Sequence, residues 1–370
     1  MTPILAVVLL AQVAAIRADR VIDPVTGHVS LKQTIIVEGE RIRAVGPNLR
    51  VPDGATVYDL PGLTVIPGLI DAHVHLAIGG SVRDNALADL RAGFTTVVDL
   101  GARTHRLLRL RDSINGGQIP GPRVLAAGIW VGRKDGVCEF GGIGIPGGAE
   151  GFRQRVRDNI AAGAEVIKVC VTGWPAGAYA SPDEYELPDS TLRAVVETAH
   201  AGHRLVIAHD ISRGGVRAAI SAGIDGLAHA AFLDSAIAAA LRRNSIFLIP
   251  TLASLTAGDT SAVSRGLIEG TGLAQRVGVR LVFGTDGGVL PHGQNAQEFV
   301  ALAAAGVPAL EQLRAATSNA AQALGLDSLG RIAPGLRADI IAVLGDPLTD
   351  VQAYQRVRFV MSRGRVALGP

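Results

Sequence analysis

Two histidines, His73 and His75, stand two residues apart in the stretch DAHVH. The apolar run that leads into them, GLTVIPGLIDAHVH, predicts a buried strand that ends at this point. Because side chains two positions apart lie on the same face of a strand, both imidazoles can reach one metal ion. The pair therefore indicates a metal site at the end of this strand.

A lysine, Lys168, lies in the middle of the apolar run AEVIKVCVTG. Burying an ammonium group costs several kcal/mol unless the charge is paired or neutralised. The chain has only two other lysines, Lys32 and Lys134, so most of its 35 basic residues are arginine. Since a buried lysine can lose its proton and an arginine cannot, Lys168 indicates amine chemistry rather than a need for charge.

Three more candidates end later apolar runs: His209, His229 and Asp286. With the first pair and Lys168 they fall at the same end of five separate predicted strands. The carboxyl ends of parallel strands meet at one face of a barrel, so we expect all six side chains to converge. The histidines in predicted turns and helices lack this pattern and are expected to be structural.

The middle of the chain alternates apolar runs with amphipathic helical stretches, which predicts an α/β fold with a parallel sheet. Eight runs are candidate strands: GLTVIPGLIDAHVH, FTTVVDLG, RVLAAGIWV, EVIKVCVTG, RLVIAHD, GIDGLAHA, SIFLIPTL and RLVFGTD. Eight such strands with crossover helices close into a (β/α)8 TIM barrel. An open doubly wound sheet is disfavoured, because HVHLAIGGSVRD after the first strand has no GxGxxG phosphate loop.

Both ends of the chain consist of short β-like pieces separated by turn residues, as in QTIIVEGERIRAVG and GRIAPGLRADIIAVLG. We therefore expect residues 1–66 plus 331–370 to form a small composite β-sandwich domain, and residues 67–330 to form the barrel.

The composition, 48% hydrophobic and 18% charged over 370 residues, excludes a disordered protein. The net charge of +2 without basic runs indicates no nucleic-acid and no membrane partner, so a small-molecule substrate is expected. Assembly into a homo-oligomer is left as an open question. Packing is the favoured role of the two cysteines, Cys138 and Cys170, with a bridge or pocket lining left open. A cytoplasmic location is expected, and the apolar first sixteen residues leave export or anchoring as the alternative.

Several segments together resemble the amidohydrolase superfamily of metal-dependent hydrolases. They are PGLIDAHVH, the strand-four lysine, the two later strand-end histidines, GTD, and the closing GRIAPGLRADIIAVLGDPLTD. The resemblance covers nearly the whole chain and is closest to the branch of Xaa-Pro dipeptidases and imidazolonepropionase-like proteins.

The resemblance implies a centre of two divalent metal ions, with zinc expected. His73, His75 and Asp286 would hold the more buried ion, and His209 and His229 the more exposed one. Lys168, carboxylated by carbon dioxide, would bridge the two as a carbamate.

Such a centre would activate water for hydrolysis of a C–N bond, with Asp286 as the catalytic base that protonates the leaving amine. A dipeptide or an N-acyl amino acid is the expected substrate. Alternatives on the same scaffold are a cyclic amide hydrolase or deaminase, a lactonase, and a catalytically silent scaffold. The last would be expected to lack a ligand, and none is missing.

Substrate contacts are expected from loops after the strands. Tyr185 and Arg213, together with Arg133 and Lys134, are candidates for a substrate carboxylate, and His292 is a candidate for the substrate carbonyl. The loop between His75 and the second strand is short, so a relative's substrate does not transfer directly.

Overall fold

The computed structural model describes residues 12–173 and 183–370 of the chain. The first eleven residues, which make up most of the apolar stretch that left export or anchoring as an alternative, lie outside the described part. No helix in the described ranges is both long and apolar enough to cross a membrane.

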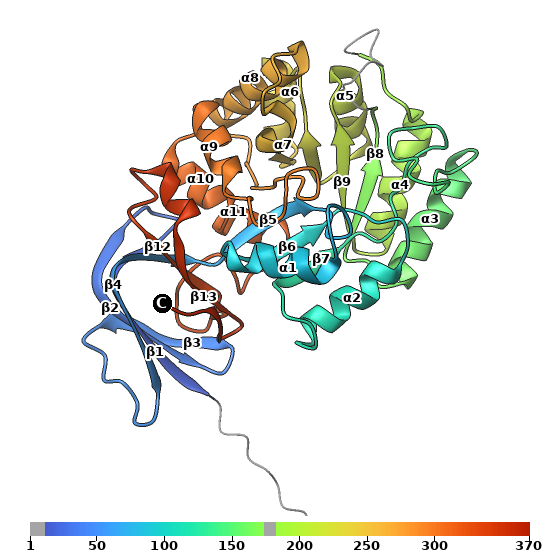
Figure 1. Cartoon of the computed structure of the whole chain (residues 1–370). Coiled ribbons are helices and arrows are strands. Elements are labelled where there is room, and N and C mark those ends of the chain that lie inside the picture. The colour runs from blue at the N-terminus through green and yellow to red at the C-terminus, as the bar shows by residue number, and fades with distance from the viewer. Residues whose placement is uncertain (1–11, 174–182) are drawn as a thin grey trace, which may run out of the picture.

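Both ends of the chain form one seven-stranded sheet, in the order β14-β13-β12-β4-β1-β2-β3 (Figure 1). Its strands are β1 (Val13–Ile22), β2 (Val29–Glu38), β3 (Arg41–Pro47), β4 (Thr56–Pro67), β12 (Ile340–Leu344), β13 (Val357–Ser362) and β14 (Arg365–Leu368). Strand β4 pairs in parallel with β1 and antiparallel with β12, which joins the N-terminal strands to the C-terminal ones. The terminal strands thus pair in one continuous sheet, where a two-sheet sandwich was expected.

The middle of the chain holds two parallel sheets, β5-β6-β7 and β8-β9-β10-β11. Their strands are β5 (Leu69–Val74), β6 (Phe94–Asp99), β7 (Arg123–Ala126), β8 (Val166–Cys170), β9 (Leu205–Asp210), β10 (Gly226–His229) and β11 (Phe247–Ile249). Single bridges, Val131 to Val169 and Leu248 to Leu281, connect these sheets to each other and to the segment before Asp286.

The eighth predicted strand, residues 280–286, is not a regular strand. Gly284 lies so close to β11 that an added Cβ would fall 2.3 Å from Ile249 Cγ2, and Asp286 adopts a left-handed backbone with φ 57°. This segment therefore meets its neighbours through bridges, Val74 to Gly287 among them, and no closed barrel ladder forms in the described residues.

Helices alternate with the parallel strands and lie outside them (Figure 1). They are α1 (Val82–Arg91), α2 (Arg106–Asn115), α3 (Ala149–Ala161), α4 (Asp189–Ala201), α5 (Arg213–Ala222), α6 (Ser235–Arg243), α7 (Leu252–Thr256), α8 (Ala262–Val277), α9 (Gln297–Ala304), α10 (Ala309–Ala315) and α11 (Ser318–Ala323), with a 3-10 turn at Val351–Gln355. Local signals set their ends: Ser212 and Ser261 cap the starts of α5 and α8, and left-handed Gly223 and Gly278 end them.

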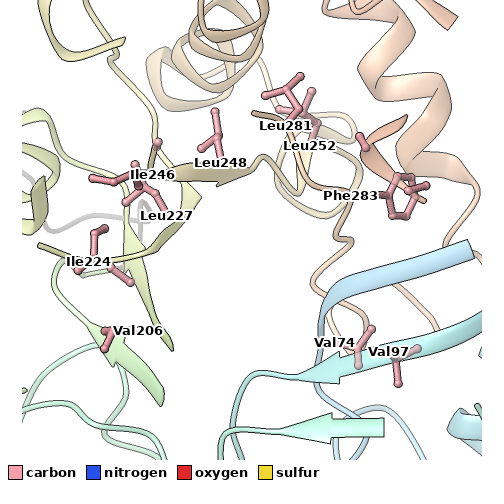
Figure 2. Close-up of a cluster of buried hydrophobic side chains, with 14 of the residues drawn as sticks. Val74, Val97, Val206, Ile224, Leu227, Ile246, Leu248, Leu252, Leu281 and Phe283 are labelled. Atoms are coloured by element: carbon pink, nitrogen blue, oxygen red, sulfur yellow. The ribbon is translucent and has the colours of Figure 1, made fainter. Parts of the chain in front are cut away.

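The parallel strands are buried on both faces. Val97, Val206, Leu227 and Leu248 belong to the cluster between strands and helices shown in Figure 2. The alternate residues Val98, Ile207, Ala228 and Phe247 belong to a second cluster that α11 also joins. This second face continues into the candidate site at the carboxyl ends of the strands.

Candidate metal centre

Strand alternation positions Lys168 and His209. Val166 on β8 and Ile207 on β9 both belong to the inner hydrophobic cluster, and the functional side chains stand two residues further along each strand. Lys168 is 2% exposed and His209 is 7% exposed. Both therefore continue the inner face, as the sequence pattern predicts.

Two other candidates depend on irregular backbone. Ala228 belongs to the inner cluster, so regular alternation would turn the next residue, His229, away from it. His229 instead adopts φ 76° and Asp286 φ 57°, and both line the same cavity. Non-glycine residues rarely adopt this left-handed conformation, and they concentrate at functional sites.

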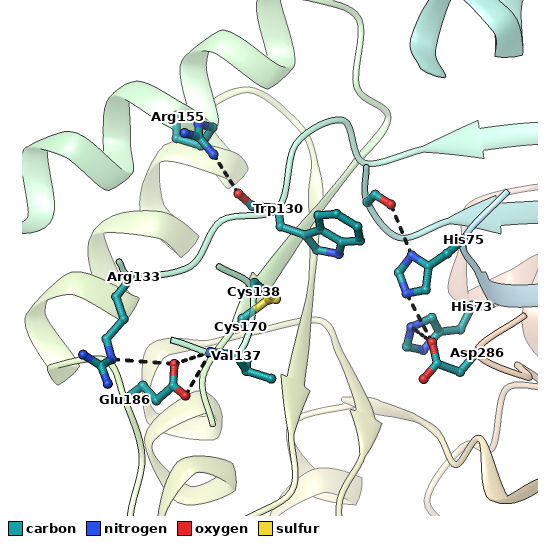
Figure 3. The surroundings of a disulfide bond; sticks show 11 residues. His73, His75, Trp130, Arg133, Val137, Cys138, Arg155, Cys170, Glu186 and Asp286 are labelled. Atoms are coloured by element: carbon teal, nitrogen blue, oxygen red, sulfur yellow. Dashed lines mark hydrogen bonds and ion pairs between the residues drawn. A yellow bond between two sulfur atoms is a disulfide. The ribbon is translucent and has the colours of Figure 1, made fainter. Parts of the chain in front are cut away.

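A buried His–His–Asp group lies at the end of β5. The Nε2 atoms of His73 and His75 are 3.3 and 3.2 Å from the same oxygen, Oδ1 of Asp286. The three residues offer ligand atoms within 4.8 Å of one another, close enough to hold one metal ion (Figure 3).

The remaining candidates border this group. The rings of His209 and His229 meet edge to face at 4.5 Å, and the ring of His229 lies 5.3 Å from that of His73. All six residues expected from the sequence line one cavity of about 70 Å³. Imidazole nitrogens and a carboxylate are the donors that zinc prefers, so this set fits a divalent metal ion.

Burial favours the neutral forms of three of the candidate histidines and of Lys168. It lowers the pKa of His209 to about 3, with the Lys168 charge adding to the effect, and the pKa values of His73 and His229 also fall well below the usual value. Burial likewise lowers the pKa of Lys168 to about 7. The Nζ of Lys168 and the Nδ1 of His73 have no hydrogen-bond partner among the described residues. Neutral, buried nitrogens are what a metal centre requires.

Asp286 stays ionised in the same surroundings. Burial would raise its pKa, but the hydrogen bond and the charge of His75 outweigh burial, and the pKa is lowered. Asp286 can therefore serve as an anionic ligand or as a proton acceptor.

Polar groups behind the candidate ligands orient them. His75 Nδ1 donates to the carbonyl oxygen of Gly101 at 3.2 Å, and His229 Nδ1 donates to Thr251 Oγ1 at 2.6 Å. Each of these bonds leaves the Nε2 atom facing the cavity. The hydroxyl of Thr251 donates onward to the carbonyl of Pro250 at 2.7 Å, which fixes it as an acceptor for His229.

Asp71 links the two strand ends that carry the His–His–Asp group. One carboxylate oxygen accepts the backbone N–H of His73 and of Thr285, and the other accepts the Thr285 hydroxyl and the Asn295 amide. Burial raises its pKa to about 7. Neither Asp71 nor Thr251 was among the residues expected from the sequence, although Asp71 is the first residue of DAHVH, directly before the two candidate histidines.

The predicted substrate contacts lie elsewhere. His292 is buried behind His75, where it donates to Asp89 Oδ2 at 2.9 Å and to the His75 carbonyl at 3.3 Å. Arg213 pairs with Asp183 through two bonds of 2.8 and 2.7 Å, and Tyr185 donates to Asp189 at 2.9 Å. These three residues do not belong to the lining of the metal cavity.

The two cysteines form a disulfide, Cys138–Cys170, beside the site (Figure 3). The sequence favoured packing and left a bridge open, and the structure shows both: strand β8 and the loop after β7 place the two side chains on the inner face, bonded to each other and packed against Trp130. Cys138 also lines the metal cavity.

The disulfide is one of several attachments of the loop over the cavity. Glu186 accepts the Val137 N–H, and Arg155 donates to the carbonyls of Trp130 and Ile143. The loop after the third predicted strand, one of those expected to contact substrate, therefore lies at the cavity. Much of the loop after the fourth predicted strand falls on residues 174–182, outside the described residues.

Parallel strands flanked by helices, with a buried His–His–Asp group at their carboxyl ends, define a metal-dependent hydrolase of the α/β class. Residues 64–367 match the amidohydrolase family. The chain therefore belongs to the amidohydrolase family, whose members hydrolyse C–N bonds with divalent metal ions.

Individual relatives cover almost the whole chain. It is 26% identical to the ochratoxinase of Aspergillus niger, over 97% of this chain and 88% of that protein. The solved structure of a Xaa-Pro dipeptidase with methionine bound in its active site is 28% identical, covers 97% of this chain and 100% of its own, and superposes with a TM-score of 0.90. The A. niger ochratoxinase structure, at 24% identity and a TM-score of 0.85, shares the fold.

Proposed function

We propose that this enzyme hydrolyses the amide or peptide bond of a small substrate, such as a dipeptide or an N-acyl amino acid, with two zinc ions. The convergence of four imidazoles, Lys168 and Asp286 in one buried cavity carries the proposal. The likeness to the Xaa-Pro dipeptidase structure supports a dipeptide-like substrate.

The donor set divides into two groups. His73, His75 and Asp286 would hold one ion, and His209 and His229 the other. Lys168 would bridge them as a carbamate, since a neutral buried amine can add carbon dioxide and release a proton. Bound there, the ions would supply Lewis acidity for the substrate carbonyl and for water.

Asp286 moves the proton. A carboxylate oxygen of Asp286 accepts a proton from the attacking water and returns it to the nitrogen of the leaving amine. The two transfers restore the charge of the carboxylate, so that it can act in every turnover.

We further propose that residues 67–330 form a (β/α)8 barrel and that residues 1–66 with 331–370 form the companion domain. The bridges Val131 to Val169, Leu248 to Leu281 and Val74 to Gly287 support closure, because they join the two parallel sheets and the Asp286 segment in strand order.

Metal analysis and 13C NMR test the centre. Enzyme produced with zinc and 13C-bicarbonate should contain about two zinc ions per chain and show a carbamate carbon signal. Lys168→Met, which keeps the buried volume, should lose the signal and at least one ion, whereas Lys134→Met on the exposed loop should retain both. Full zinc content and full activity in Lys168→Met would contradict the two-metal centre.

A substrate screen tests the reaction. Dipeptides and N-acyl amino acids should be hydrolysed, and Asp286→Asn should lower kcat by a factor on the order of 10² to 10⁴, because the proton acceptor is lost. Turnover of lactones without turnover of any amide would overturn the assignment.

A further inference from the structure

A second, larger cavity adjoins the metal cavity. It has a volume of about 910 Å³, the size of a small-molecule site. Ile78, Trp130 and Phe140 line both cavities, so the two share a wall. Trp130 also connects them through ring contacts, with centroids 5.4 Å from His75 and 4.7 Å from Phe140.

The shared wall presents apolar surface. Ile78 is 37% exposed and Phe140 is 38% exposed, although both belong to residue types that are usually buried. Val82, Leu107 and Leu110 extend the apolar lining away from the metal cavity. Such a surface suits an aromatic or branched aliphatic group.

The charged residues that line this cavity are all positive. Its lining contains three arginines, Arg83, Arg103 and Arg106, and no aspartate or glutamate. Within the described residues, the side chains of these three arginines form no ion pair and no hydrogen bond, in contrast to Arg213, which is held by Asp183. Arg103 reaches toward the loop between β7 and α3, where a Cβ added to Gly141 would lie 3.9 Å from Nη1 of Arg103.

We propose that this cavity holds the part of the substrate that bears a carboxylate, with Arg103 and Arg106 binding the carboxylate. The apolar group of the substrate lies against Ile78 and Phe140, and the bond to be broken extends past Trp130 into the metal cavity. Guanidinium groups suit this task because they stay charged and can donate two parallel bonds to a carboxylate. The inference rests on the proposed hydrolysis of amide substrates and identifies their class as anionic and apolar.

The test measures binding without turnover. Isothermal titration calorimetry compares 3-phenylpropanoate with 3-phenylpropanamide, which has the same shape without the charge. The wild-type holoenzyme should bind the carboxylate roughly tenfold tighter than the amide, since a hydrogen bond to a charged group contributes more than a neutral one. Arg103→Ala/Arg106→Ala should abolish this preference and leave binding of the amide unchanged.

Arg109→Ala is the matched control, because Arg109 belongs to the same helix as Arg106 and does not line the cavity. It should keep the wild-type preference. If the double variant kept the preference for the carboxylate over the amide, the inference would be overturned. It would also be overturned if that preference disappeared only on removal of the metal, because the carboxylate would then bind the metal.

Kinetics separates this inference from the proposed function. With an N-acyl amino acid substrate, the double variant should raise KM roughly tenfold and change kcat less, because ground-state binding is lost. If the enzyme hydrolysed no amide but still bound the phenylpropanoate through these arginines, the proposed function would fail and the anion site would stand.

Discussion

At the residue scale, a hydrogen bond from Nδ1 determines which nitrogen of His75 and of His229 faces the cavity. The clearest case is His229, whose Nδ1 donates to Thr251 at 2.6 Å, while Thr251 itself has φ 54°. The residue that orients the ligand is thus itself held in an uncommon conformation. This indicates that packing around Thr251 stabilises the arrangement that the site needs.

Thr251→Val should lower zinc affinity by about 10- to 100-fold, because valine keeps the β-branched shape but cannot accept the bond from His229. Competition with a chromogenic chelator measures the affinity at constant pH. Thr251→Ser, which keeps the hydroxyl, should bind zinc close to the wild-type level. Equal affinity in the valine variant would show that the hydroxyl does not orient His229.

At the element scale, the loop between β7 and α3 forms one wall of the metal cavity although it has no helix or regular strand of its own. The disulfide attaches it to β8, Arg155 attaches it to α3, and Glu186 attaches it to the segment before α4 (Figure 3). Gly132 permits this close packing, since a Cβ there would lie 3.0 Å from the Cβ of Cys138. The position of Phe140, which lines both cavities, depends on these attachments.

Cys138→Ser/Cys170→Ser should lower the thermal midpoint and expose the loop to proteolysis. The bond closes a chain segment with a sequence separation of 32, for which chain entropy predicts about 3 to 4 kcal/mol. Differential scanning calorimetry and limited proteolysis measure the two effects, and reduced wild-type enzyme is the control. If the midpoint did not differ between oxidised and reduced enzyme, the disulfide would have no stabilising role.

At the scale of the whole molecule, the two chain ends meet in one sheet with its own hydrophobic cluster, separate from the clusters around the parallel strands. Phe359 on β13 is fully buried there and packs against Tyr58 at 5.4 Å between ring centroids. Strand β4 leads from this sheet into β5, which carries His73. The terminal sheet therefore fixes the start of the strand on which the metal site begins.

Phe359→Ala should destabilise the enzyme by about 3 to 5 kcal/mol, because it removes buried apolar surface and leaves a cavity. Urea denaturation measures the change, and Phe359→Leu should cost less because it fills more of the space. Zinc affinity of the folded variant should stay at the wild-type level, since Phe359 lines neither cavity. Loss of zinc at full stability would contradict this separation of roles.

The sequence by itself determined the strand periodicity, and hence the inner-face positions of Lys168 and His209, because alternation is a local property of the backbone. His73 and His75 reach the cavity past an irregularity in the pairing of β5 between Asp71 and Val74, which alternation does not predict. The sequence also indicated the six residues that converge, and the joining of both chain ends. It could not determine the left-handed turns at His229 and Asp286, the irregular strand at 280–286 or the disulfide.

Only the tertiary structure decided those features, because each depends on contacts between segments far apart in the chain. The same reason explains why spacing does not predict substrate contacts. Arg213 and Tyr185 are engaged by nearby carboxylates, whereas Arg103 and Arg106 come to line the cavity next to the metal cavity only when the loops after β5, β6 and β7 are brought together. Spacing along the chain identified the candidate metal donors, and packing between the loops decided what lies beside them.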